Sequence, residues 1–464
     1  MNKKIMQIIV ISMFLFIAVG CDDDANNNAA NNQNSEICDN NLDDDGDSEV
    51  DCDDADCVND DACAVNNVNN NVNNQTIVTR KVDIVFVVDT SLSMAAHQVV
   101  LQNHIPDLVQ VLGDVSGGLP DLHVGVITPD LGSAPYNIPG CETPGGDFGR
   151  FLKGTDNACA NPVGQGFVVD VEPAGCMIEK SIIEGEPTTC TTHDCSQANC
   201  EVAAFTDLEG IASEPAGLIL GIDENGCPRC RNYAEQTLET TLTCLMDQGT
   251  NGCGFEQPLE ALKLAITGGV EENLFFLRAD AYLAIVFVTD EDDCSVKQAE
   301  LFNPQGDINS TLGTLTSFRC TEFGVVCDQD WVRVMPEGSA QYTGCVSRPA
   351  NDPRSLLFPV SSYVSILQSL KAPGMVAATV IAGPTDGSLT VGLDANQNPT
   401  LEPSCDTMEM GAMPAVRLKD FVSQLGTDAE TPEWAFHPVC DSDFSPALIG
   451  LATWIRDGVE RTAP

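Results

Sequence analysis

Three unbroken apolar runs place the strongest constraint on the fold of this chain. They cover residues 84–88 (Ile-Val-Phe-Val-Val), 283–288 (Leu-Ala-Ile-Val-Phe-Val) and 375–381 (Met-Val-Ala-Ala-Thr-Val-Ile). Runs of this kind are typical of central parallel strands that are covered on both faces. Residues 124–127 are a fourth candidate strand, and residues 434–436 are a weaker fifth.

Segments with helical periodicity lie between these runs. Their apolar residues are spaced by three and four positions, as one face of a helix requires: Leu101, Ile105, Leu108 and Leu112; Leu259, Leu262 and Ile266 after Pro258; Leu448, Leu451, Ala452 and Ile455 after Ser445-Pro446. The alternation predicts an α/β fold with an open, doubly wound, mainly parallel sheet of the Rossmann-like type. Two Cys-, Gly- and Pro-rich intervals, about 131–245 and 294–358, are predicted to be disulfide-rich insertions.

The cysteines indicate a protein that leaves the cytosol. Apart from Cys21 they form groups of even size: four from Cys38 to Cys63, ten from Cys141 to Cys253, four from Cys294 to Cys345, and the last two, Cys405 and Cys440. This pattern predicts a disulfide framework in an oxidising compartment, with Cys405 paired to Cys440. The stretches 190–195 (Cys-Thr-Thr-His-Asp-Cys) and 227–230 (Cys-Pro-Arg-Cys) could instead hold zinc or act in redox chemistry, but the even count favours disulfides.

The first residues resemble an export signal. Lys3 and Lys4 precede an apolar run, residues 8–19, that is too short for a typical membrane span. The run ends in Ala18-Val19-Gly20-Cys21, which resembles the lipobox of bacterial lipoproteins. The resemblance implies a signal peptide over residues 1–20, cleavage before Cys21 and a lipid on its thiol, and therefore a place in the bacterial cell envelope. A plain secretory signal is the alternative.

Composition restricts the partners that the chain can bind. It carries 69 Asp and Glu against 21 Lys and Arg, for a formal charge of −48. Such a surface repels nucleic-acid phosphates and suits hard cations. Residues 21–36 and 64–79 are low in complexity and rich in Asn, which predicts a flexible N-terminal tether around the segment 37–63.

The segment 37–63 is rich in Asp and Cys and has the pattern of a calcium loop. The side chains that could supply oxygen ligands are Asn41, Asp43, Asp45, Asp47, Asp51 and Asp53, and Gly46 stands where such a loop turns sharply. The segment resembles thrombospondin type 3 repeats and the MopE-type metal-binding motif of bacterial surface proteins. Unlike an EF-hand, it has Cys52 rather than Glu at the twelfth position from Asn41. A solvated acidic spacer without Ca²⁺ is the alternative.

Two acidic turns follow two of the apolar runs. Residues 89–93 read Asp-Thr-Ser-Leu-Ser, and residues 289–293 read Thr-Asp-Glu-Asp-Asp. The carboxyl ends of parallel strands meet at one edge of an open sheet, so Asp89 and Asp290 are expected to face each other if their strands are neighbours. Two close carboxylates require a cation, and carboxylate with hydroxyl oxygens suits Mg²⁺ or Mn²⁺.

The Asp-x-Ser-x-Ser turn after an apolar strand, together with the later Thr-Asp, resembles the von Willebrand factor type A (VWA) domain, here over residues 80–464 with the two insertions. The resemblance implies a metal-ion-dependent adhesion site formed by Asp89, Ser91, Ser93 and Asp290. The Thr that the family supplies from a second loop is replaced by Gln257, with Glu256 beside it, unless Thr250 takes its place. The alternative is that the two serines cap one helix and Asp290 caps the next.

What the resemblance implies for function is recognition rather than catalysis. In such domains an acidic side chain of a protein or matrix partner completes the coordination of the metal. The chain contains no Gly-x-Ser-x-Gly elbow, His-Glu-x-x-His pair or phosphate loop. We therefore expect a lipid-anchored envelope protein that binds such a partner and is not an enzyme. A metal-buffering or structural surface protein with a passive VWA scaffold is the first alternative, and an exported hydrolase is the second.

Overall fold

The structure is a computed structural model that describes residues 79–156, 161–183, 186–200, 217–223, 225–407, 410–426 and 431–461. The chain divides into two units, Met1–Thr76 and Ile77–Pro464, and all described residues belong to the second. The predictions for Cys21, for the tether and for the calcium segment 37–63 therefore lie outside the described residues. No helix of the described residues is both long enough and apolar enough to span a membrane.

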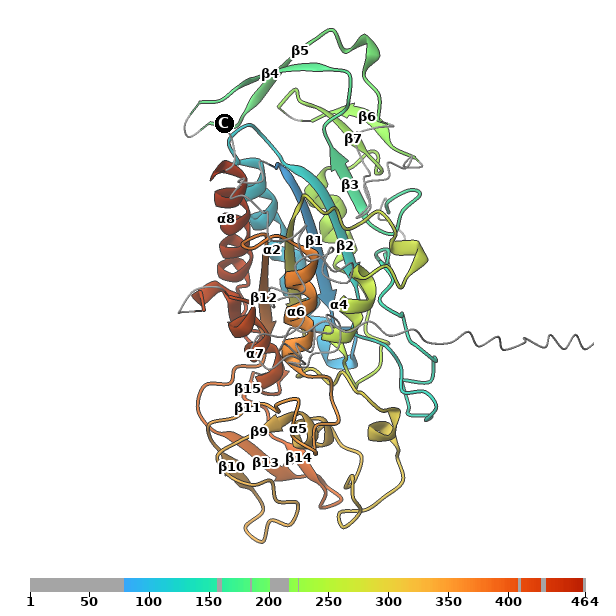
Figure 1. The fold of residues 1–464 in the computed structure, drawn as a ribbon, viewed down its shortest axis with the longest axis vertical. Helices are drawn as coiled ribbons and strands as arrows, with labels where there is room; N and C mark the ends of the chain where they lie inside the picture. Colours follow the sequence, from blue (N-terminus) through green and yellow to red (C-terminus); the bar gives the residue numbers. More distant parts are fainter. Residues whose placement is uncertain are drawn as a thin grey trace, which may run out of the picture. The chain divides into compact units, whose positions relative to one another are not determined.

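An eight-stranded mixed sheet forms the centre of this unit (Figure 1). In chain order its strands are β1 (Lys81–Val88), β2 (Asp121–Ile127), β3 (Val168–Val171), β6 (Ile219–Ile222), β7 (Pro228–Arg231), β8 (Tyr282–Val288), β12 (Val376–Ala382) and β17 (Phe436–Pro438). Across the sheet the order is β17-β12-β8-β1-β2-β3-β7-β6. The first five in this order are parallel, whereas β3, β7 and β6 are each antiparallel to their neighbours.

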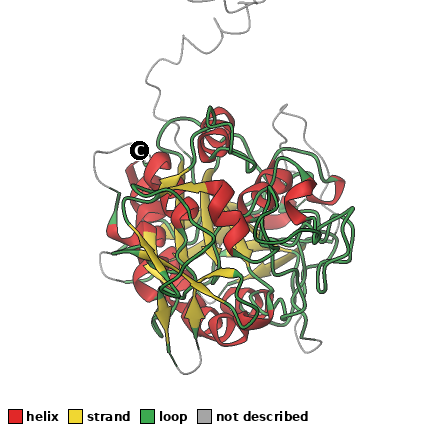
Figure 2. Ribbon diagram, turned by 90° about the horizontal axis from the view of Figure 1, so that it is seen from below, coloured by secondary structure: helices red, strands yellow, loops and turns green. Residues whose placement is uncertain are grey.

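Helices cover both faces of the sheet, as Figure 2 shows. On one face α2 (Ala95–Gly113), α3 (Leu238–Leu245) and α8 (Ser445–Arg461) pack on Ile84, Phe86 and Val88. On the other face α4 (Pro258–Ile266), α6 (Val360–Leu370) and α7 (Val416–Leu425) pack on Val85 and Val87. Alternate residues of β1 point to opposite faces, and both faces are buried, which explains why its apolar run is unbroken.

The four stronger strand predictions and all three helix predictions are confirmed, since β1, β2, β8, β12, α2, α4 and α8 lie where the patterns placed them. The weaker fifth strand begins at Phe436, because residues 433–435 form a short 3₁₀ turn. The sheet is mixed, and the expectation of parallel strands holds for five of its eight strands. The parallel strands are those that were predicted, and the three antiparallel strands make the sheet mixed.

All three antiparallel strands come from the interval 131–245, so part of this disulfide-rich insertion extends the sheet. β3, β6 and β7 have only four residues each, too few for a periodic pattern to stand out. The same interval also contains the hairpin of β4 (Met177–Ser181) and β5 (Thr189–His193), which is separate from the main sheet.

The interval 294–358 folds into a lobe with a later segment that had not been assigned, residues 383–415. Its elements are α5 (Phe318–Gly324), β9 (Val325–Val326), β10 (Ala340–Tyr342), β11 (Val346–Ser347), β13 (Leu389–Leu393), β14 (Pro399–Leu401), β15 (Cys405–Asp406) and β16 (Gly411–Ala412). β10, β13 and β14 form a three-stranded sheet over a small apolar core. The lobe lies beyond the carboxyl end of β1, at the bottom of Figure 1.

Seven disulfides join cysteines of the described residues, which confirms the predicted framework. They pair Cys141 with Cys253, Cys176 with Cys195, Cys190 with Cys227, Cys200 with Cys230, Cys294 with Cys320, Cys327 with Cys345, and Cys405 with Cys440. The predicted pairing of the last two is confirmed. The four cysteines of the stretches 190–195 and 227–230 are all disulfide-bonded, so their thiolates are not available to zinc.

Candidate cation-binding site

The two acidic turns meet at one edge of the sheet, as the sequence predicts. β1 and β8 are neighbours in register, with Val88 opposite Val288. The Asp89 backbone N–H donates to the Val288 carbonyl at 3.0 Å, and the Thr289 hydroxyl donates to Asp89 Oδ2 at 2.7 Å. The hydroxyl of Thr289 is thus part of the site, although the sequence pointed only to Asp290 in this turn.

The two serines of the first turn do not cap a helix with their side chains. The Ser91 backbone N–H donates to Asp89 Oδ1 at 2.7 Å, and the hydroxyl oxygens of Ser91 and Ser93 lie 3.2 Å apart. Both hydroxyls also stabilise the charged form of Asp290 and so lower its pKa, against the stronger effect of burial. Asp89, Ser91, Ser93 and Asp290 therefore lie together, and the helix-capping alternative is not observed.

Four carboxylates of the site have raised pKa values. Burial, followed by the charge of Asp290, raises the pKa of Asp89 to about 7. Burial also raises the pKa of Asp290, which His97 partly offsets. The pKa of Glu256 lies well above its usual value because of burial and the charge of Asp89, and that of Glu291 rises to about 8 because of burial and the charge of Asp290. The cluster thus carries more negative charge than its surroundings compensate.

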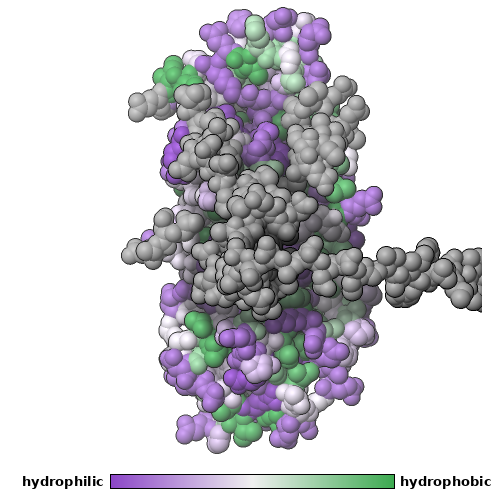
Figure 3. All heavy atoms as spheres, viewed as in Figure 1, coloured by the Kyte–Doolittle hydropathy of each residue, from purple (hydrophilic) through white to green (hydrophobic). Residues whose placement is uncertain are grey.

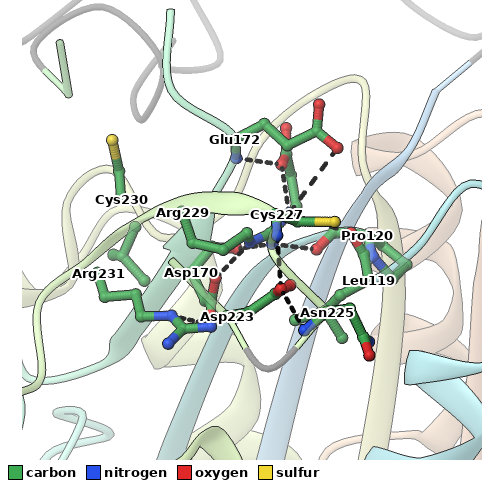
Figure 4. Close-up of polar contacts among 12 residues, drawn as sticks. Leu119, Pro120, Asp170, Glu172, Asp223, Asn225, Cys227, Arg229, Cys230 and Arg231 are labelled. Carbon is green, nitrogen blue, oxygen red and sulfur yellow. Dashed lines mark hydrogen bonds and ion pairs between the residues drawn. The ribbon is translucent and has the colours of Figure 1, made fainter. Parts of the chain in front are cut away.

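Other buried carboxylates of this protein have basic partners. Asp170 accepts from Arg229 Nε at 2.6 Å and from Arg231 Nε at 3.0 Å (Figure 4), and Asp83 accepts from Arg278 Nε at 2.8 Å. In contrast, no Lys or Arg of the described residues forms an ion pair with Asp89, Glu256, Asp290 or Glu291. Buried carboxylates are normally paired or coordinate a metal, and these four have no Lys or Arg partner within the part of the chain that the structure describes.

Two oxygens of the cluster are buried without a hydrogen-bond partner in the described part of the chain: Asp290 Oδ1 and Glu256 Oε1. Asp290 is 4% exposed and Glu256 is 1% exposed. Leaving such an oxygen without a partner costs about 1–3 kcal/mol, and more when the group is charged. Within the described residues, no group of three or more His, Cys, Asp and Glu side chains could hold a metal by itself. The hydroxyls of Ser91 and Ser93, which lie beside Asp290, are oxygen donors of the kind that hard cations accept.

The second loop presents Glu256, rather than Gln257, to this cluster. The Gln257 amide is engaged elsewhere, because its Nε2 donates to the Gly132 carbonyl at 3.4 Å and its Oε1 accepts from Val296 N–H at 3.3 Å. Thr250 is half-buried in the neighbouring loop, and no hydrogen bond of the described structure joins it to Asp89.

Three further residues position the site, and the sequence did not point to them. Gln98 of α2 donates from Nε2 to the carbonyls of Asp89 and Gly249, at 2.8 Å each, and so joins the first turn to the second loop. Asp292 accepts from the backbone N–H groups of Arg417 and Leu418 in the first turn of α7, and Asp293 accepts from the Leu259 N–H of α4. An Asp close in sequence to a helix start can be recognised as its cap. Asp292 could not be recognised in this way, because α7 begins more than 120 residues further along the chain.

Comparison of the chain with protein-family models, with curated proteins and with solved structures finds no match.

Proposed function

We propose that this chain binds a divalent cation, Mg²⁺ or Mn²⁺, between the turns that follow β1 and β8. Asp89, Ser91, Ser93 and Asp290 would hold the ion, with Glu256 as the carboxylate from the second loop. The bound cation would supply a Lewis-acidic site for an anionic group of a partner.

One observation carries this proposal: within the described residues, buried oxygens of Asp290 and Glu256 have no hydrogen-bond partner, and no Lys or Arg forms an ion pair with the carboxylates around them. A hard divalent cation removes both costs, because it neutralises the charge and occupies oxygen lone pairs. The place of the site, where two neighbouring parallel strands end, agrees with the resemblance to the VWA domain.

We further propose that the protein acts in the cell envelope, anchored by a lipid on Cys21, and captures a protein or matrix ligand through an acidic side chain of that ligand. The disulfides support an oxidising compartment. On the face that Figure 3 shows, the described residues in view are mostly hydrophilic, and the hydrophobic ones form small groups.

Titration calorimetry of the full chain with Mg²⁺ and Mn²⁺ tests the proposal. We expect saturable binding that Asp89→Ala abolishes and that Asp290→Asn or Glu256→Gln weakens by about tenfold or more. Asp114→Asn is the matched control, because it removes an exposed carboxylate at the end of α2 and should leave the affinity unchanged.

Ligand capture is tested on the same variants. Capture of an envelope partner should be lost in EDTA, restored by Mg²⁺ and absent in Asp89→Ala. Uptake of Ca²⁺ by the segment 37–63 alone, with no Mg²⁺ uptake by residues 80–464, would instead favour the metal-buffering alternative.

A further inference from the structure

The acidic turn 289–293 divides its carboxylates between two tasks. Asp290 and Glu291 lie in the carboxylate cluster with Asp89. Asp292 instead binds the start of α7, where it accepts from Arg417 N–H at 3.0 Å and from Leu418 N–H at 3.2 Å. The turn that contains Asp290 is therefore hydrogen-bonded to the start of α7.

The side chain of Arg417 also binds this turn, through an ion pair with Asp293. The guanidinium is 1% exposed, and it donates to Asp293 Oδ2 from Nη2 at 2.8 Å and from Nε at 3.1 Å. Nη2 also donates to the Phe358 carbonyl at 2.7 Å, at the end of the Cys-rich interval. Arg417 thus joins the turn, α7 and the lobe at one buried point.

The segment before Arg417 also binds this turn, through the backbone of Asp290. The Met413 N–H donates to the Asp290 carbonyl at 2.8 Å. Residues 413–418 consequently hold the turn through Asp290, Asp292 and Asp293. Arg417 therefore binds the same turn that carries the Asp290 carboxylate, through Asp292 and Asp293.

The rigidity of a site decides which cation it prefers. Mg²⁺ requires near-octahedral geometry with oxygens at about 2.0–2.1 Å, whereas Ca²⁺ accepts about 2.3–2.6 Å and irregular geometry. A loop that is held firmly can enforce the shorter distances, and a loosened loop adapts to the larger ion.

We propose that Arg417 is a positioning residue that makes this site selective for Mg²⁺ over Ca²⁺ by fixing the turn 289–293. This inference rests on the proposed function, because it requires that the site binds a cation.

The test compares Arg417→Gln with wild type in the full chain, by calorimetry with Mg²⁺ and with Ca²⁺. We expect the Kd for Mg²⁺ to rise by about tenfold or more, as outer-shell changes do, and the Kd for Ca²⁺ to rise much less. The ratio of the two affinities is the readout, because a general loss of stability would not shift it. Thermal unfolding of each variant is recorded in parallel.

Arg348→Gln is the matched control. Arg348 is also 1% exposed, donates to the Val325 carbonyl at 2.7 Å and to Asp352 at 2.6 Å, and makes no described hydrogen bond to the turn 289–293. It should lower stability without changing the Mg²⁺ to Ca²⁺ ratio.

An unchanged ratio in Arg417→Gln, or the same shift in both variants, would overturn the role of Arg417. Wild-type protein that binds neither ion would overturn the proposed function as well, so the two failures are distinct. If Arg417→Gln does not fold, Arg417→Leu combined with Asp293→Leu removes the ion pair without leaving a buried charge, and the same shift in ratio is expected.

Discussion

At the scale of single residues, this protein treats its buried carboxylates in two ways. Asp83 and Asp170 each lie against guanidinium groups. The pKa of Asp83 is lowered, because Arg278 and Lys371 overcome the effect of burial. Asp89, Asp290, Glu256 and Glu291 instead lie close to one another, and removal from water raises the pKa of each. The first group supports the fold, and the second supports our proposed function.

This difference predicts how stability depends on pH when no divalent cation is present. The pKa of Asp89 rises from 3.8 in the unfolded chain to about 7 in the folded protein, and that of Glu291 rises to about 8. Folded protein therefore holds more protons than unfolded protein between these values, and stability should fall as the pH rises from about 5 to about 8. One pKa unit corresponds to about 1.4 kcal/mol, so we expect a loss of several kcal/mol.

Denaturant unfolding in EDTA across this pH range measures the effect. Saturating Mg²⁺ should reduce the loss, and Asp89→Asn should flatten the pH dependence in EDTA. A free energy of unfolding that is constant or rises between pH 5 and pH 8 would contradict the electrostatic interpretation of the cluster.

At the scale of elements, close contacts decide how the terminal helix α8 packs. Gly450 lies inside α8, and a Cβ atom added there would lie 2.3 Å from Trp434 Cβ. Trp434 belongs to the 3₁₀ turn that leads into β17. Gly450 lowers the helix propensity of α8, but its missing side chain allows α8 to approach the edge of the sheet.

Two glycine substitutions should consequently have opposite effects. Gly450→Ala should lower the free energy of unfolding by about 1–3 kcal/mol, because overpacking outweighs the gain in helix propensity. Gly113→Ala, at the end of α2 with no atom within 4 Å of the added Cβ, should raise it by about 0.5–1 kcal/mol. Equal effects in urea unfolding would show that the Trp434 contact does not restrain α8.

At the scale of the whole molecule, the loops around the site come from distant parts of the chain and share one small core. A disulfide between Cys141 and Cys253, which are separated by 112 residues, joins the loop after β2 to the loop between α3 and α4. Both cysteines pack in an apolar cluster with Cys294, Phe302 and Leu357, which follow the turn 289–293. The loops around the site therefore pack on one another through this cluster.

Removing this disulfide should affect binding as well as stability. Cys141→Ser with Cys253→Ser should cost about 2–5 kcal/mol of stability and weaken Mg²⁺ binding. Cys176→Ser with Cys195→Ser removes a disulfide beside β4 and β5, at the opposite end of Figure 1 from the lobe, and should leave the Mg²⁺ affinity unchanged. Calorimetry and thermal unfolding of both double variants measure these effects. An equal loss of Mg²⁺ affinity in the two variants would contradict a specific role of the Cys141–Cys253 disulfide in binding.

The sequence by itself determined the parallel half of the sheet, because strands buried on both faces must be apolar throughout, as residues 84–88 and 283–288 are. It also determined that Asp89 and Asp290 follow such strands. Only the tertiary structure decided that β3, β6 and β7 complete the sheet, that Glu256 rather than Gln257 joins the carboxylates, and that Arg417 holds the turn 289–293. Periodicity reports the environment of one segment, whereas these contacts unite side chains that are far apart in the chain and leave no local pattern.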